Sequence, residues 1–117
     1  MARRRIDPET GWAAVAAWQA GDQQATTTAV RFTLEELAAR APGSAVEVRV
    51  PPAGAVQCVA GVRHTRGTPP NVVQTDPQTW LALATGQIRW ADAVAAGRVT
   101  ASGLRADLRD VLPLCPP

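Results

Sequence analysis

The sequence predicts one α/β (α+β) domain in which helices pack on a sheet. The chain has 117 residues, of which 46% are hydrophobic, so it can form a single buried core and is not a disordered polypeptide. Residues 75–108 follow the order helix, turn, helix and strand, with a glycine after each helix. Residues 45–60 read as two strands joined by a turn rich in proline. These two stretches supply the helices and strands of a mixed domain.

The N-terminal part predicts a basic tail followed by a helix. Residues 1–6 contain a run of three arginines and no apolar periodicity, so we expect a disordered tail. Asp7 is a favourable N-cap, and Pro8 suits the first helical position, where no backbone N–H is needed. Gly21 is expected to end this helix.

A polar loop and a second helix are expected next. Residues 22–28 lack hydrophobic periodicity and predict a loop. Thr33 and Glu36 have the spacing of a capping box, so we expect the second helix to begin at Thr33. Pro42, which a glycine follows, is expected to end it.

Two strands are expected to form a hairpin after the second helix. Val46, Val48 and Val50 alternate with charged residues, which predicts a strand with one buried and one solvated face. The turn over residues 51–54 and the apolar stretch after it predict an antiparallel partner strand.

The stretch from residue 75 onward carries the clearest signals. Asp76 and Pro77 repeat the cap seen at the first helix, and Gly86 ends the helix that they begin. A short helix is expected from about residue 90 to 96, and residues 98–102 alternate as a half-buried strand.

The C-terminal segment allows two interpretations. The apolar residues from Leu104 to Leu112 fit either a strand or a helical stripe. We favour a strand to Leu108 and then a short helical turn that Pro113 stops. Residues 114–117 form an uncharged tail, which is expected either to lie across the core or to gate a cavity.

Residues 75–103 resemble the C-terminal half of sterol carrier protein 2 (SCP2) domains. The motifs that carry the resemblance are Trp80-Leu81-Ala82-Leu83, Gly86-Gln87-Ile88, the short helix ending in Gly97-Arg98-Val99, and Ser102-Gly103. The chain as a whole resembles a small stand-alone bacterial member of that family. This resemblance implies about five strands in a mainly antiparallel or mixed sheet, helices on one side of it, and an apolar tunnel between the two layers.

The resemblance also implies a function and a set of tunnel residues. We expect a non-enzymatic protein that binds or transfers a fatty acid, phospholipid or sterol, with transient membrane contact. The implied walls of the lipid-binding cavity are Trp80, Leu83, Ile88, Val94, Val99, Leu108 and Leu112. Alanine-rich helices leave room for such a cavity, although small side chains would equally permit close helix–sheet packing without one.

The loop at residues 62–71 is the second candidate site. Arg63 and Arg66 could bind a carboxylate or phosphate headgroup, with His64 donating a further hydrogen bond. The same composition is typical of an exposed loop that prolines stiffen. Both interpretations remain open from the sequence.

Catalytic and metal chemistry find no support in the sequence. A single histidine cannot assemble a metal site or a catalytic triad, so no catalytic residue, metal ligand or cofactor is predicted. Cys58 and Cys115 are expected to be free thiols in a reducing compartment. The alternatives to a lipid carrier are an accessory domain of an enzyme and a protein-interaction module, for which the exposed tryptophans or the apolar tail could form an oligomer interface.

The charge and hydropathy of the chain favour neither nucleic-acid binding nor a membrane span. A net charge of +2 with scattered arginines gives no general attraction to nucleic acid. No apolar run reaches the roughly 20 residues that a membrane span needs. We therefore expect a cytoplasmic protein.

Overall fold

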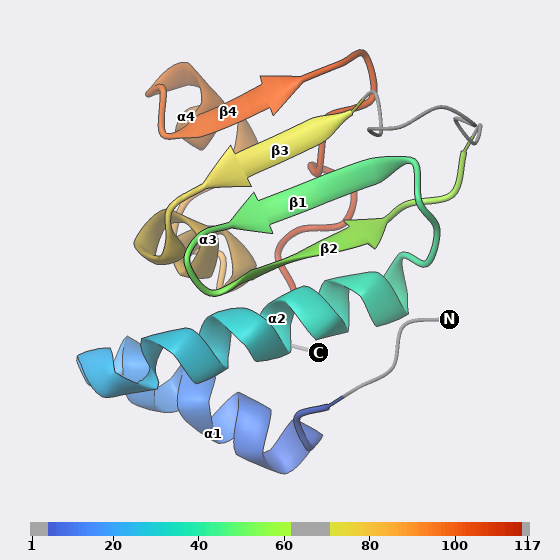
Figure 1. Ribbon diagram of the computed structural model, residues 1–117. Coiled ribbons are helices and arrows are strands. Elements are labelled where there is room, and N and C mark those ends of the chain that lie inside the picture. Colours follow the sequence, from blue (N-terminus) through green and yellow to red (C-terminus); the bar gives the residue numbers. More distant parts are fainter. Residues whose placement is uncertain (1–4, 62–70, 116–117) are drawn as a thin grey trace.

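A mixed sheet forms one layer of the protein, and helices form the other (Figure 1). The computed structural model describes residues 5–61 and 71–115. In chain order, the elements are α1 (Pro8–Gln19), the 3-10 helix η1 (Gln23–Ala25), α2 (Thr26–Arg40), β1 (Val46–Val50), β2 (Gly54–Cys58), β3 (Val72–Thr75), α3 (Pro77–Ala84), α4 (Trp90–Ala95) and β4 (Val99–Ser102). This arrangement confirms the predicted α/β class.

The sheet has the strand order β2-β1-β3-β4. β1 runs antiparallel to β2 and parallel to β3, and β3 runs antiparallel to β4. The described residues thus form four strands, where the resemblance implied about five. Val46, Val48 and Val50 are buried, whereas Glu47 and Arg49 form an ion pair of 2.8 Å on the opposite face. The predicted alternation of β1 is therefore confirmed.

The helices lie on one face of the sheet and along its β2 edge. Figure 1 shows α3 and α4 behind the strands, with the C-terminal segment descending behind the sheet to end beside α2. α2 contacts both β2 and α3, and α1 packs on α2. Gly11 permits this close approach, because a methyl group at its position would overlap the ring of Phe32. Trp12 meets the same ring edge to face, with 5.0 Å between centroids.

The caps of α1 and α3 are as the sequence predicts. The carboxylate of Asp7 accepts a hydrogen bond from Thr10 N at 3.3 Å. The carboxylate of Asp76 accepts one from Thr79 N at 2.9 Å and another from the Thr79 hydroxyl at 2.6 Å. Each cap satisfies a donor that the first turn of a helix leaves unpaired.

The N-terminal tail meets α2 where the described residues begin. Residues 1–4 lie outside the part of the chain that the structure describes. Arg5 and Ile6 donate their backbone N–H groups to Glu35 Oε1 at 3.2 and 3.1 Å. These two hydrogen bonds hold the last residues of the expected tail against α2.

The predicted start of α2 is wrong. The helix begins at Thr26, and η1 leads into it directly, so little of the expected loop remains. Thr33 lies inside the helix, where its hydroxyl donates to the carbonyl of Ala29 at 2.7 Å. Ala29 and Val30 are fully buried, so packing extends the helix backward past the apparent capping box.

The strand predicted over residues 104–108 is also wrong. The backbone N–H of Arg105 donates to the side chain of Asn71 at 2.9 Å, not to a neighbouring strand. Asn71 in turn donates to the carbonyl of Ala45 at 2.9 Å, which fixes this corner to the start of β1. Leu104 is fully exposed, whereas Leu108 is fully buried. The helical turn expected before Pro113 is confirmed, since Val111 N and Leu112 N both donate to the Leu108 carbonyl.

The core fills the space between the sheet and the helices. Its fully buried large side chains include Phe32, Trp80, Leu81, Leu108 and Leu114. Within the two described ranges, each helix is too short or too polar to cross a bilayer.

Candidate functional site

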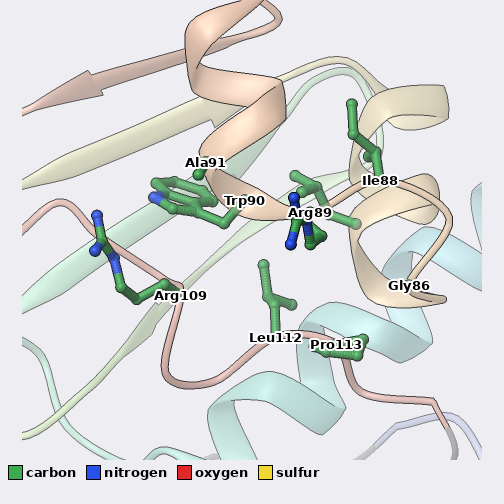
Figure 2. Close-up of a pocket in the computed structure, with 9 residues that line it drawn as sticks. Gly86, Ile88, Arg89, Trp90, Ala91, Arg109, Leu112 and Pro113 are labelled. Atoms are coloured by element: carbon green, nitrogen blue, oxygen red, sulfur yellow. The ribbon is translucent and has the colours of Figure 1, made fainter.

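A pocket of about 510 Å³ opens at one end of the helical layer. It lies between the last turn of α3, the turn that leads into α4, and the C-terminal segment (Figure 2). The lining residues are Leu83, Gly86, Ile88, Arg89, Trp90, Ala91, Arg109, Leu112 and Pro113. This volume lies within the range of about 300–1,000 Å³ that is typical of small-molecule sites. Because most of the lining is apolar, the pocket suits an apolar ligand.

The turn between α3 and α4 forms one wall of the pocket. Gly86 ends α3 with a φ of +80°, a backbone conformation that residues other than glycine rarely adopt. Gln87 N and Ile88 N then both donate to the Ala82 carbonyl, at 2.8 and 3.3 Å. This closed turn holds Ile88 at the pocket, which Leu83 of α3 also lines.

The C-terminal segment forms the opposite wall. Leu114 N and Cys115 N both donate to the carbonyl of Ala84 at the end of α3, at 2.8 and 3.1 Å. Arg40 of α2 donates to the Leu114 carbonyl at 2.8 Å. These hydrogen bonds hold the segment across two helices, so Leu112 projects into the pocket (Figure 2).

Two arginines stand at the mouth of the pocket. Arg89 Nε lies 3.3 Å from Asp92 Oδ2, and Arg109 Nε lies 2.9 Å from Asp107 Oδ2. Both ion pairs are largely exposed, so each contributes at most about 1 kcal/mol to stability. The indole of Trp90 lies between the two guanidinium groups in Figure 2.

A second hollow of about 520 Å³ lies between the N-terminal segment, α2 and β2. Its lining includes Arg5, Arg31 and Glu35 and has no large aromatic side chain. Since charged side chains make up more of its wall, it fits an apolar ligand less well than the pocket at the end of α3.

The comparison with known protein families identifies the chain. A family model described as bacterial SCP ortholog matches residues 22–114. The protein belongs to this bacterial sterol carrier family. A search of curated proteins finds no match. The matched range contains all four strands and every residue that lines the pocket.

The structure of this sterol carrier family member separates the seven implied cavity residues. Leu83, Ile88 and Leu112 line the pocket. Trp80, Val99 and Leu108 are buried in the core and do not line it. Val94 is 41% exposed on the outer side of α4 and does not line it either.

Sequence reasoning missed Trp90, Arg89 and Arg109 as pocket residues. Trp90 and Arg89 adjoin Ile88, which the sequence did indicate, so position along the chain could have pointed to them. Arg109 reaches the pocket only because the C-terminal segment folds back over α3, and no local pattern predicts that path. The expected headgroup residues Arg63, His64 and Arg66 lie outside the described residues.

The described residues contain no group of three or more His, Cys, Asp or Glu side chains that could hold a metal ion. Cys58 and Cys115 are free, as predicted. Burial raises the pKa of the Cys58 thiol to about 11. A thiol of that pKa is protonated at neutral pH and is a poor nucleophile.

Proposed function

We propose that this sterol carrier family member binds lipid-like apolar ligands reversibly, without transforming them. The observation that carries the proposal is a pocket of about 510 Å³ with mainly apolar walls at the end of α3. Each methylene group moved from water into such a site contributes about 0.8 kcal/mol in transfer free energy. A fatty acid, the tail of a phospholipid or a sterol could therefore bind without a strong polar contact.

A carrier role without chemistry is supported by the side chains around the pocket. Its lining contains no cysteine, histidine, serine or carboxylate, so none of the usual nucleophiles or general bases faces a bound ligand. The two free cysteines are consistent with the reducing cytoplasm, where we propose that the protein acts.

Ligand uptake tests the proposal directly. The purified protein would be examined by native mass spectrometry, alone and after incubation with a mixture of fatty acids, phospholipids and sterols. We expect an added mass that organic extraction releases and identifies. A bare protein mass after incubation with every class of lipid would overturn the proposal and leave a protein-interaction module as the remaining function.

A matched pair of variants on α4 tests the location. Ala91 and Ala95 are both exposed on the same helix, but only Ala91 lines the pocket. We expect Ala91→Trp to fill the mouth and abolish uptake, and Ala95→Trp to leave uptake intact. Equal uptake by both variants would show that the ligand binds elsewhere.

A further inference from the structure

The outer edge of β2 directs backbone groups away from the sheet. Glu47 N donates to the carbonyl of Asn71 at 2.9 Å, so the backbone of Glu47 faces β3. Because the backbone groups of successive strand residues alternate between the two sides of the strand, the three valines of β1 face β2. They pair with the first, third and fifth residues of β2. The second and fourth residues, Ala55 and Gln57, therefore direct their N–H and C=O groups outward.

These outward groups are open to a new partner. Figure 1 shows α2 running alongside β2, and the two elements are in contact. Val59 N, just after β2, donates to the carbonyl that follows α2 at 2.7 Å, and Arg31 Nε of α2 donates to the carbonyl just before β2 at 3.1 Å. Between these two contacts, the N–H and C=O groups of Ala55 and Gln57 make no hydrogen bond to any residue within the described ranges. Both residues are exposed, and such an edge is a template for another strand.

A groove runs beside this edge. The hollow of about 520 Å³ between the N-terminal segment, α2 and β2 is lined by Ile6 and Leu34, by residues 53–56, and by charged side chains that include Arg5 and Arg31. An edge strand beside such a groove suits strand addition, in which backbone hydrogen bonds hold an extended peptide and pockets receive its alternate side chains. The groove therefore fits an extended polypeptide better than a compact ligand.

The charge of the groove favours acidic peptides. The Nη groups of Arg31 and the guanidinium of Arg5 make no hydrogen bond or ion pair with any residue that the structure describes. Glu35 is the only acidic residue in the described lining, and its Oε1 already accepts from Arg5 N and Ile6 N at 3.2 and 3.1 Å. Two guanidinium groups with free donors against one carboxylate leave the groove positively charged, which complements the carboxylate side chains of a partner.

We propose that the β2 edge binds an extended acidic segment of a partner protein, which joins the sheet as an additional strand. The backbone of the segment pairs with Ala55 and Gln57, and its carboxylates pair with Arg5 and Arg31. This inference does not depend on the proposed function, because the groove shares no lining residue with the pocket at the end of α3.

Three peptides with the same backbone test the preference for acidic side chains. Each is a capped heptapeptide in which threonine alternates with glutamate, glutamine or lysine, and its dissociation constant for the full chain would be measured by fluorescence anisotropy. We expect the glutamate peptide to bind about tenfold more tightly than the glutamine peptide and the lysine peptide to bind most weakly. The advantage of glutamate should shrink as salt is added. Equal binding of the three peptides, or no binding of the glutamate peptide, would overturn the inference.

Hydrogen exchange at single amides, followed by NMR, tests strand addition itself. The amides of Ala55 and Gln57 should exchange quickly in the free protein and slowly when the glutamate peptide is saturating. The amide of Val56 faces β1 and should be protected in both states, so it is the internal control. Slow exchange of Ala55 and Gln57 in the free protein would mean that the chain itself or a second copy already occupies the edge. Either occupant would overturn the inference, and sedimentation would distinguish them.

A matched pair of proline variants tests which edge is used. Ala55→Pro removes an outward N–H, and edge strands tolerate proline where the N–H faces solvent. Ala101→Pro is the control on β4, because the alternation of β3 and β4 points the Ala101 N–H away from β3. We expect Ala55→Pro to weaken binding of the glutamate peptide at least tenfold and Ala101→Pro to bind like the wild type. Unchanged binding by a folded Ala55→Pro variant would overturn the inference.

A pair of arginine variants tests the charge without altering the strand. Arg31→Gln should lower the ratio of glutamate-peptide to glutamine-peptide affinity several-fold. Arg89→Gln removes the same charge from the exposed start of α4, outside the groove, and should keep the wild-type ratio. Thermal unfolding would verify that each variant is folded. Equal ratios in the two variants would overturn the inference.

Discussion

Trp80 and Trp90, both on helices of the same layer, have different surroundings. Around Trp80 the side chains close on one another: the ring is fully buried, and its N–H is paired with Thr33 inside the core. Trp90 is nearly as buried as a whole, but it borders a pocket, and its Nε1 is accessible and has no partner among the described residues. Both residues begin or lie within helices of similar apolar composition. Overall burial therefore does not distinguish the two tryptophans. They are distinguished by whether the indole N–H has a hydrogen-bond partner within the protein.

The C-terminal segment contributes residues both to the core and to the pocket. Leu108 is fully buried in the core, while Leu112 is half-buried and lines the pocket. Between them the chain makes one helical turn, so residues four positions apart serve the core and the site. The buried residues stabilise the fold, and the pocket at the other end leaves part of the segment's apolar surface uncovered.

The largest expected effect is a difference in stability between alanine variants of these two leucines. Leu108→Ala should lower the free energy of unfolding by about 2–5 kcal/mol, because it leaves a cavity among fully buried neighbours. Leu112→Ala should lower it by about 1 kcal/mol or less, since part of the side chain already faces open space. Urea unfolding of both variants measures the two losses. Losses of equal size would mean that the pocket wall is part of the core, and the contrast between the two ends would not hold.

A smaller effect tests the hydrogen bond that closes the Trp80 end. Thr33→Val keeps the shape of the side chain but removes the oxygen that accepts from Trp80 Nε1. The stranded indole N–H should lower the free energy of unfolding by about 1–3 kcal/mol.

The matched control is Thr85→Val at the end of α3. The Thr85 hydroxyl donates to the carbonyl of Leu81 at 2.7 Å and accepts from no residue within the described ranges, so its loss strands no donor. We expect a change within about 0.5 kcal/mol. If the two threonine variants lose similar stability, the pairing of Trp80 is not what closes this end.

Much of the fold could be predicted from the sequence because the signals are local. The Asp-Pro pairs at Asp7 and Asp76 set the starts of α1 and α3, and valine alternation gave β1. These features depend on residues within one turn or one strand of each other. The start of α2 could not be predicted in this way, because buried neighbours extend the helix beyond a local capping pattern at Thr33.

The candidate site could be predicted only in part, because only some of its residues belong to a local sequence pattern. Leu83 and Ile88 belong to a continuous stretch whose turn is encoded by Gly86. Val94 lies on the same short helix as Ala91, but it faces outward, and helical periodicity alone does not say which face a six-residue helix buries. Arg109 depends on the path of the C-terminal segment, which hydrogen bonds to Ala84 and Arg40 determine.

The smallest expected effect concerns Asp76, which begins the helix that both ends share. Burial raises the pKa of this carboxyl, but hydrogen bonds from the side chain and backbone of Thr79 outweigh burial and hold the pKa below its ordinary value of 3.8. A carboxyl whose pKa is lower in the folded state stabilises the fold at pH values well above 3.8. That contribution is lost as the pH falls from there through the lower pKa of the folded state.

Asp76→Asn keeps an acceptor for the cap and removes the titration. We expect the variant to lose less than about 1 kcal/mol of unfolding free energy at neutral pH, and to show a shallower decline in acid than the wild type. Unfolding measured from about pH 7 to about pH 3 gives both slopes, and Asp7→Asn at the exposed cap of α1 serves as the comparison. While the protein stays folded, the affinity for an uncharged sterol should not follow this titration, because Asp76 does not line the pocket. An affinity that fell in parallel with stability would mean that the closed and open ends are coupled through α3 and are not independent parts of the layer.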